Sequence, residues 1–188
     1  MKFTFADARL AFPDIFEPNK DGKFAAAFIF PTDHESIALL KKLIDEVGAA
    51  KWGAKWATLR KELTANDNML IHNGDAKASY VGYEGNLFFN ANNTVRPLVI
   101  DRDKTPLVAA DGKPYSGCHV NVIIDVWAQD NQYGKKINAQ LQGIQFLRDG
   151  EAFSGGGVAA DQSDFEEITE RSEERRAGKE CRSRWSPY

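Results

Sequence analysis

The sequence predicts a mainly β domain that carries one helical insertion, an α+β arrangement. Three observations lead to this fold class. Short segments of alternating apolar residues occur on both sides of residues 32–63, and residues 32–63 themselves carry apolar residues at helical spacing. Gly, Pro, Asn and Asp separate these segments at short intervals, as turns between strands require.

The N-terminal part is predicted to form a β-hairpin. Residues 2–12 and 23–30 both carry strand-like apolar residues, and we place their ends at Pro13 and Pro31. Between them, Asn19-Lys-Asp-Gly22 is a strong turn signal because Gly permits a positive φ. Both segments are therefore expected to pair as antiparallel strands.

The insertion is predicted to be a pair of helices. Thr32-Asp-His-Glu35 fits a capping box at the start of the first helix, and Gly48 suits its C-terminal cap. The second helix is expected over Ala50–Leu63. Each helix has one apolar stripe for packing on the sheet: Ile37, Leu40, Ile44 and Val47 in the first, and Trp52, Trp56, Leu59 and Leu63 in the second.

The C-terminal half returns to strands. Asn86–Asn90 is brief and apolar, and Val120–Ala128 alternates so that its valines share one face and Trp127 lies on the other. A polar hairpin loop is expected over Asp130–Lys136, and Gly143 is expected to mark a bulge in the last strand. Six or seven strands with one helical insertion predict an OB-fold, a five-stranded barrel with extended loops, over residues 1–148; a small sandwich would also fit the strand pattern.

Residues 149–170 read as a flexible, disordered acidic C-terminal arm. The segment has seven Asp or Glu residues and no Lys or Arg, and beyond its Gly/Ala/Ser stretch it ends in acidic residues around one aromatic, Phe165. Residues 171–188 change abruptly to six Lys or Arg against three Glu and look like the translation of a sequencing adapter. We interpret them as a non-native scar, with a basic nucleic-acid-binding arm as the alternative.

The charge balance permits a nucleic-acid partner without arguing for one. The whole chain has a net charge of −3, whereas residues 1–148 hold 18 Lys or Arg and 17 Asp or Glu, a net charge of +1. No apolar stretch reaches the length of a membrane span, and Cys118 alone can form neither an intramolecular disulfide nor a zinc site. We expect a reduced, intracellular protein without a membrane partner.

The sequence has no HExxH, paired CxxC or GxSxG motif and no phosphate loop ending in GKS or GKT. His34, His72 and His119 are isolated, and Cys118-His119 would face opposite ways in a strand. Asp75-Ala-Lys77 is half of a nuclease-like pattern, but metal-dependent cleavage needs several convergent carboxylates. We predict that the protein is not an enzyme and needs no cofactor. A metal-dependent nuclease is one alternative.

Aromatic and basic residues in two regions suggest a surface for unpaired bases. Trp127 is expected outside the barrel, where it could stack on a base, or else beneath the helical insertion. Three more aromatic residues are predicted to stack on bases. Tyr83 and Phe88 lie in the region around Tyr80–Asn90, and Tyr133 lies in the hairpin loop that follows the strand of Trp127. Phosphate contacts are predicted for nearby cations: Lys77, Arg96, Lys135 and Lys136.

In order and spacing, several short motifs resemble a bacteriophage single-stranded-DNA-binding protein family, formerly catalogued as a domain of unknown function. The resemblance covers about residues 1–170, and the motifs that carry it are Gly82-Tyr-Glu-Gly85, Phe89-Asn-Ala91, Arg96-Pro97, Tyr115-Ser-Gly-Cys118, Asn121–Trp127, Leu141-Gln-Gly143 and Asp149-Gly150.

This resemblance implies an OB-fold protein that binds and protects single-stranded DNA, tolerantly of sequence, during phage replication, recombination or repair in the cytoplasm of the infected bacterial host. It also implies that the acidic arm recruits phage or host replication proteins and competes with DNA. The residues of the arm with this role would be Asp161, Asp164, Phe165, Glu166 and Glu167. A phage structural or adaptor protein without nucleic-acid binding is the alternative, and the sequence leaves a homo-oligomer open.

Overall fold

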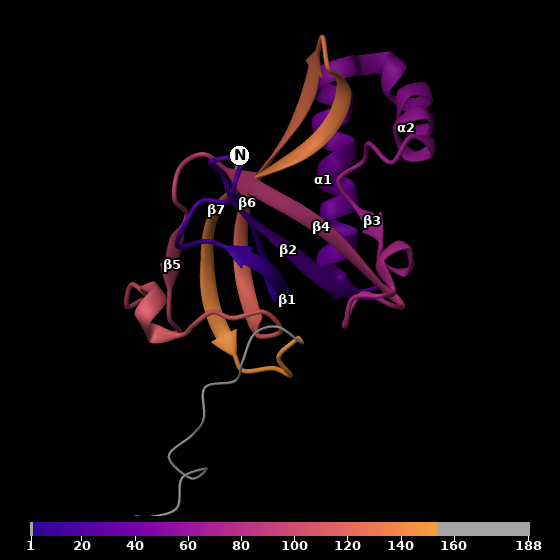
Figure 1. The fold of residues 1–188 in the computed structure, drawn as a ribbon. Coiled ribbons are helices and arrows are strands. Elements are labelled where there is room, and N and C mark those ends of the chain that lie inside the picture. The colour runs from indigo at the N-terminus through magenta and orange to yellow at the C-terminus, as the bar shows by residue number, and fades with distance from the viewer. Residues whose placement is uncertain (1, 154–188) are drawn as a thin grey trace, which may run out of the picture. The chain divides into compact units, whose positions relative to one another are not determined.

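In the computed structural model, which describes residues 2–153, seven strands and two helices follow one another along the chain (Figure 1). Short 3-10 turns lie at Gly53–Lys55, Gly74–Lys77 and Ala109–Asp111. The elements are β1 (Lys2–Asp14), β2 (Phe24–Pro31), α1 (Glu35–Trp52), α2 (Trp56–Ala65), β3 (His72–Asn73), β4 (Asn86–Asn93), β5 (Leu98–Ile100), β6 (His119–Asn131) and β7 (Gly134–Arg148).

Five of the strands close into a barrel. The sheet order is β3-β4-β2-β1-β6-β7-β5, and an additional parallel pairing joins β4 to β7 at Ala91–Ala139 and Asn92–Gln140. This pairing links the two ends of the β4-β2-β1-β6-β7 series, so these strands form the closed barrel of an OB-fold. The prediction of a five-stranded barrel is confirmed, and the sandwich alternative is wrong.

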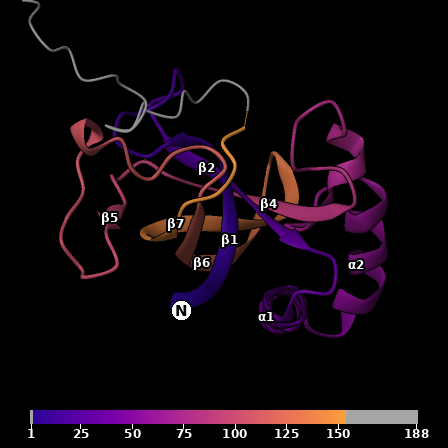
Figure 2. The ribbon, with the colours of Figure 1, turned by 90° about the horizontal axis from the view of Figure 1, so that it is seen from below.

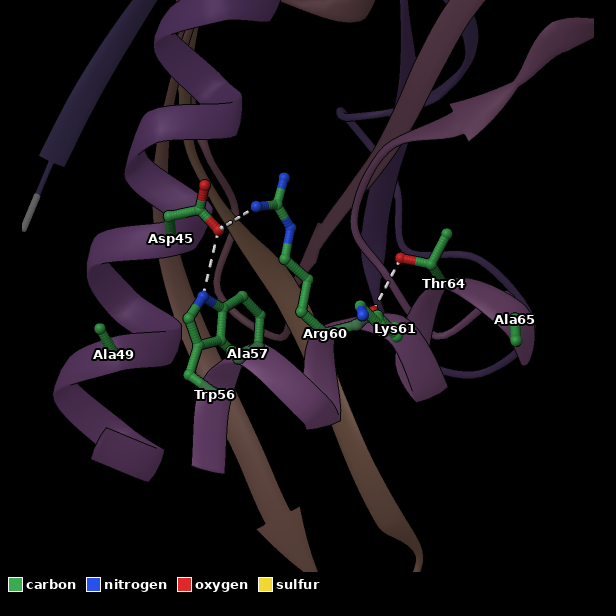
Figure 3. Close-up of a pocket in the computed structure, with 8 residues that line it drawn as sticks. All are labelled: Asp45, Ala49, Trp56, Ala57, Arg60, Lys61, Thr64 and Ala65. Atoms are coloured by element: carbon green, nitrogen blue, oxygen red, sulfur yellow. Dashed lines mark hydrogen bonds and ion pairs between the residues drawn. The ribbon is translucent and has the colours of Figure 1, made fainter. Parts of the chain in front are cut away.

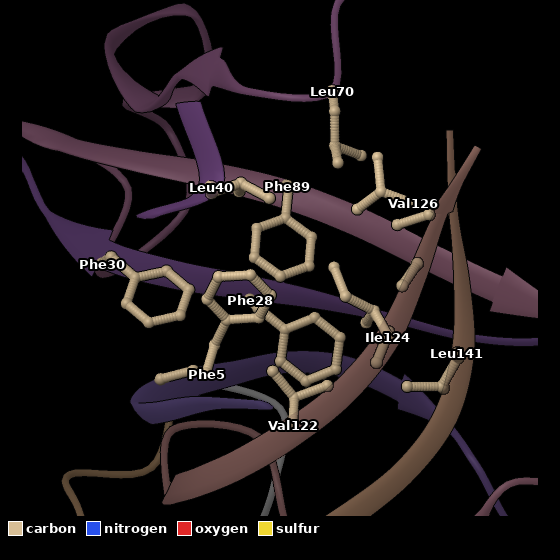
Figure 4. Packing of buried hydrophobic residues seen from close by; sticks show 14 of the residues in the cluster. Phe5, Phe28, Phe30, Leu40, Leu70, Phe89, Val122, Ile124, Val126 and Leu141 are labelled. Atoms are coloured by element: carbon tan, nitrogen blue, oxygen red, sulfur yellow. The ribbon is translucent and has the colours of Figure 1, made fainter. Parts of the chain in front are cut away.

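The inward faces of the barrel strands form one apolar core (Figure 4). Phe5, Phe28 and Phe89 meet at its centre, with Phe89 edge-on to Phe5 at 6.2 Å between ring centroids. The valine face of β6 is fully inside, as predicted from its alternation. Because side chains alternate across a strand, burying this face places Trp127 on the outer surface.

The helical insertion joins β2 to β4 and lies on one side of the barrel, opposite β5 (Figure 2). Leu40 and Ile44 of α1 and Leu59 and Leu63 of α2 enter the barrel core, so the predicted stripes are confirmed for these residues. The second helix begins at Trp56 rather than at Ala50 because α1 continues to Trp52.

Both predicted caps of the first helix are wrong. The N-cap is His34, whose Nδ1 accepts a hydrogen bond from Ser36 N at 3.1 Å, so Thr32 lies outside the helix. The C-cap is Gly53. Gly48 has another role, because a Cβ there would lie 2.5 Å from the ring of Trp56. The glycine is needed for the close packing of α2 on α1.

The β6–β7 hairpin is longer than expected. Asn131 pairs with Gly134, so the loop is Gln132-Tyr133 alone, and Lys135 and Lys136 belong to β7. The predicted loop over Asp130–Lys136 is therefore wrong. A two-residue turn with Gly134 at φ +106° allows the strands to pair up to their ends.

The bulge predicted at Gly143 is confirmed. Ile123 pairs with Gly143 and Ile124 with Leu141, which leaves Gln142 as the extra residue of β7.

A second apolar cluster covers the outer surface of β1, β2 and β4. Its members are Ala11, Ala27, Ile29, Tyr83, Phe88 and Phe153. Phe153 is held by its N–H, which donates to Ser116 O at 3.1 Å, and by Arg9, whose guanidinium lies 4.5 Å from the ring centroid. Residues 149–153, which the sequence assigned to the arm, are thus held against the barrel by the burial of Phe153.

Candidate nucleic-acid interface

A row of outward-facing positions crosses the barrel strands. Asp14 of β1 pairs with Ala25 of β2, Ala25 with Asn92 of β4, and Asn92 with Gln140 of β7. Gln140 lines one pocket together with Trp127, which belongs to β6. Since neighbouring strands lie ~4.8 Å apart, these residues form one continuous path over the sheet.

Trp127 stands at the β6 end of this row. Its side chain is 45% exposed, and its pocket is also lined by Lys23, Asn92, Asn93, Thr94 and Gln140. The alternative that Trp127 packs beneath the helical insertion is wrong, because α1 instead contacts the hairpin through Trp52, whose Nε1 donates to Asp130 Oδ2 at 2.8 Å. An exposed indole beside a lysine and several amides can stack on a base while the cation meets a phosphate.

The two adjacent lysines of β7 lie on opposite faces of the hairpin. Lys136 pairs with Gln129, which shares the outer face with Trp127, and Asn138 Nδ2 donates to Gln129 Oε1 at 3.0 Å. Lys135 pairs with Asp130, the residue that contacts α1. Only Lys136 therefore lies on the Trp127 face.

Tyr133 occupies the tip of the hairpin and is 79% exposed. Its N–H donates to Asn131 Oδ1 at 2.9 Å, which shapes the turn, while no ring contact to Tyr133 occurs within residues 2–153. The ring is therefore accessible to a base at the end of the Trp127 face.

The structure brings Tyr83, Phe88 and Lys77 together, but it buries the two rings. Tyr83 is 1% and Phe88 3% exposed, with ring centroids 4.9 Å apart. Lys77 Nζ lies 4.7 Å from the Phe88 centroid. A base cannot stack on either ring in this arrangement, so the prediction that Tyr83 and Phe88 stack on bases is wrong. Lys77 lies beside the two buried rings and can still contact a phosphate.

The burial of Tyr83 has an electrostatic consequence. Burial, with a smaller contribution from Tyr80, raises the pKa of the Tyr83 hydroxyl to about 12. The surrounding chain is packed so closely that a Cβ on Gly74 would collide with the Tyr83 carbonyl oxygen. Tyr83 is thus a neutral, tightly packed phenol.

Arg96 follows β4 and lies beside the loop between β1 and β2. Its guanidinium is 5.6 Å from the ring centroid of Phe16, which belongs to this loop. The loop of residues 15–23 and the β6–β7 hairpin flank the outer faces of β2 and β4, where OB-folds bind oligonucleotides. Arg96 and Lys23 are therefore cations at the loop side of the face.

Sequence reasoning missed several residues of this face. Lys23, Asn92 and Gln140 come from three distant segments and meet only because β4 pairs with β7. Phe12 and Tyr80, whose exposed rings line a different pocket, were not predicted as site residues either. Only the alternation around Asn92 and Gln140 could have marked them as outward-facing.

The histidines and Cys118 do not form a reactive group. His119 Nδ1 lies 2.7 Å from Asp7 Oδ1, and Arg148 binds the same carboxylate at 2.9 Å. Burial lowers the pKa of His119, whereas for Asp7 the hydrogen bonds from Arg148 and His119 outweigh burial and lower the pKa. Burial raises the pKa of the Cys118 thiol to about 11, so the thiol stays protonated at neutral pH.

Within residues 2–153, no three His, Cys, Asp or Glu side chains gather as metal ligands, and no helix there is long and apolar enough to cross a membrane. The predicted arm residues Asp161, Asp164, Phe165, Glu166 and Glu167, like the predicted scar, lie outside the described part of the chain.

Another pocket lies on the helical insertion (Figure 3). Asp45 of α1 joins the two helices there: it accepts a hydrogen bond from Trp56 Nε1 at 3.1 Å and pairs with Arg60 at 3.1 Å. The other lining residues are mainly alanines, with Lys61 and Thr64. The contacts of Asp45 thus hold the two helices together, and this pocket shares no lining residue with the Trp127 pocket.

Comparisons with known proteins point to one family. The sequence model of one family, described as Enterobacter phage Enc34, ssDNA-binding protein, matches residues 1–175. Protein p50 of Acyrthosiphon pisum secondary endosymbiont phage 1 is 42% identical over 182 residues, which cover 93% of this chain and 97% of that protein.

Solved structures share the fold. The single-stranded DNA-binding protein from bacteriophage Enc34 is 26% identical, with a TM-score of 0.66 over 87% of this chain and 88% of the other. Its complex with single-stranded DNA has a TM-score of 0.68 at 23% identity, over 81% and 89% of the two chains. The bacteriophage T7 single-stranded DNA-binding protein gp2.5 is 14% identical, with a TM-score of 0.57 over 89% and 98%.

The last two likenesses, below 25% identity, support the fold alone. The family match spans nearly the whole sequence and includes every strand of the barrel. The chain therefore belongs to the family of the Enterobacter phage Enc34 ssDNA-binding protein.

Proposed function

We propose that this protein binds single-stranded DNA, without catalysis and tolerantly of sequence, on the outer face of β2, β4 and β7. The observation that carries the proposal is the half-exposed Trp127 in a pocket with Lys23 and Gln140, between the loop of residues 15–23 and the β6–β7 hairpin. Family membership and the solved DNA complex of a relative support it.

In this proposal, Trp127 and Tyr133 stack on successive bases, and Lys23, Arg96 and Lys136 meet phosphates. Stacking on an aromatic ring tolerates any base, because every base has a π face, and it contributes ~1–3 kcal/mol per base. Lys77 lies beyond the buried Phe88 ring and extends the positive charge along the outer surface. Duplex DNA offers the rings no base faces and should bind far more weakly.

The same proposal covers the biological setting. We infer that the protein protects single strands during phage DNA replication, recombination or repair, in the cytoplasm of the infected bacterium. The acidic segment that ends near Glu170 would compete with DNA for the cations of the face and recruit replication proteins, because it is strongly negative and surrounds one aromatic residue, Phe165.

Fluorescence anisotropy tests the binding proposal directly. The full chain is titrated into a labelled ~30-nucleotide single strand at several salt concentrations, with duplex of the same sequence as the control. We expect salt-sensitive binding to the single strand and an intact oligonucleotide after incubation with Mg²⁺. Equal affinity for duplex would contradict stacking, and no binding in low salt would favour a structural or adaptor protein.

The acidic competitor needs its own comparison. Asn or Gln at Asp161, Asp164, Glu166 and Glu167 removes four negative charges from the full chain. If the arm competes, this variant binds the single strand more tightly than the wild type, and the difference shrinks as salt rises.

A further inference from the structure

A second pocket on the outer surface has no role in the interface described above. It lies at the β1 end of the row of outward-facing positions, and half of its lining residues are aromatic: Phe12, Tyr80, Tyr83, Tyr115 and Phe153. Ser79 and Ser116 add hydroxyl groups. Its lining thus combines ring faces with hydrogen-bonding groups.

Phe12 is held outward by an irregularity in β1. Ala11 pairs with Ala27 but Asp14 with Ala25, so Phe12 and Pro13 together face the single residue Ala26. The backbone of Phe12 has φ +47°, and its ring is 54% exposed. A positive φ is costly for a bulky residue, and bulges often re-aim side chains beside binding sites.

Tyr80 stands next to Phe12. It is 51% exposed, and the two rings meet edge to face with 5.3 Å between their centroids. Two exposed rings in contact leave ring faces free for a third planar group.

Tyr83 adds a polar group below this pair. Its ring centroid lies 6.3 Å from that of Phe12 and 6.2 Å from that of Tyr80, and its buried hydroxyl has no hydrogen-bond partner within the described residues. A buried hydroxyl without a partner is unfavourable, so a ligand group that reaches it supplies a hydrogen bond that the described residues do not.

The second pocket is connected to the Trp127 pocket by the outward-facing row. Asp14, which lines the second pocket, is followed across the sheet by Ala25, Asn92 and Gln140, and Asn92 and Gln140 line the Trp127 pocket. Along this row, through β2 and β4, three strand spacings separate β1 from β7, roughly 14 Å over the surface. One extended single strand of a few nucleotides can reach both pockets.

We propose that the second pocket takes a base of the same single strand that binds at Trp127. Phe12 and Tyr80 stack on the base, and the Tyr83 hydroxyl hydrogen-bonds its edge. The inference rests on the proposed single-strand binding and adds a subsite to it. The DNA then runs from Trp127 over β7, β4 and β2 to the second pocket at β1. A short oligonucleotide fills only the Trp127 end of this path.

Binding as a function of oligonucleotide length tests the subsite. Unlabelled oligo-dT of increasing length competes with a labelled single strand for wild-type full chain and for Phe12→Gly, Tyr80→Ala and Trp127→Ala. Phe12→Gly removes the ring and suits the positive φ, so the fold is preserved. Leu39→Ala, an exposed apolar residue of α1, is the matched control.

We expect Trp127→Ala to weaken binding at every length. Phe12→Gly and Tyr80→Ala should leave the shortest oligonucleotides unaffected and weaken the longer ones by about 5- to 100-fold. Tyr83→Phe keeps the ring and should weaken only the longer ones, by about 2- to 10-fold. Leu39→Ala should match the wild type throughout.

Two failures are distinguishable. If wild-type protein and Trp127→Ala behave as expected but Phe12→Gly and Tyr80→Ala match the wild type at every length, the subsite proposal is overturned and the binding function stands. If the wild type binds no oligonucleotide, both proposals are overturned.

Discussion

Two aromatic groups on the outer surface of one barrel differ in what covers them. Tyr83 and Phe88 are buried under Phe153 and the chain before β4, and they act as a second core outside the barrel. Trp127 projects from β6 into a pocket whose other lining residues are all polar, and it stays half exposed. Aromatic rings beside basic residues therefore differ in availability according to the chain that crosses them: the rings of Tyr83 and Phe88 stabilise the fold, whereas we propose that the exposed ring of Trp127 contacts DNA.

The largest effect should separate the two groups by stability. Phe88→Ala removes a buried ring and should lower the free energy of unfolding by about 3–5 kcal/mol, whereas Trp127→Ala should change it by less than about 0.5 kcal/mol. Urea denaturation of both variants measures the difference. Comparable losses would mean that Trp127 also supports the fold.

The second effect separates them by binding. Trp127→Ala should weaken single-strand affinity by ~1–3 kcal/mol, since a stacked base loses its ring. Anisotropy titration under conditions where the protein is fully folded gives the value. Unchanged affinity would mean that Trp127 does not contact the single strand.

Lys135 and Lys136 offer a smaller but well-matched test. Lys136→Ala should reduce the slope of log K against log salt by about 0.7, the contribution of one phosphate contact to a single strand. Lys135→Ala removes the same charge from the face towards α1 and should leave more of the slope intact. Equal reductions would show that charge near the hairpin matters but its face does not.

The smallest effect concerns alkaline pH. The folded-state pKa of Tyr83 is raised to about 12, above the ordinary value of 10.0, so folding favours the neutral phenol. Its contribution to stability is complete below pH 10 and is lost as pH rises from 10 towards 12. Tyr83→Phe cannot ionise and should lose less stability than the wild type over this window, measured by urea denaturation at each pH. An identical decline in both proteins would argue against the burial of this hydroxyl.

Strand alternation predicted the parts of the fold that depend on local pattern. It placed the valines of β6 inside and Trp127 outside, and the glycine at residue 143 correctly marked a bulge. The C-terminal end of α1 was missed because two glycines competed for one cap, and only the packing of Trp56 on Gly48 decides between Gly48 and Gly53. The hairpin loop was missed because polar residues at its strand ends look like a loop in sequence.

The strands, the helical insertion and the motifs that resemble a phage DNA-binding family could be predicted from the sequence, because they depend on residue order. Which aromatic rings remain available depends instead on contacts between distant segments. Tyr83 and Phe88 carry the same local signals as exposed rings, and their burial depends on Phe153, which lies far along the chain. Likewise, Lys23, Asn92 and Gln140 join Trp127 only through the closure of the barrel. The pairing of β4 with β7 brings together residues that lie far apart in the sequence.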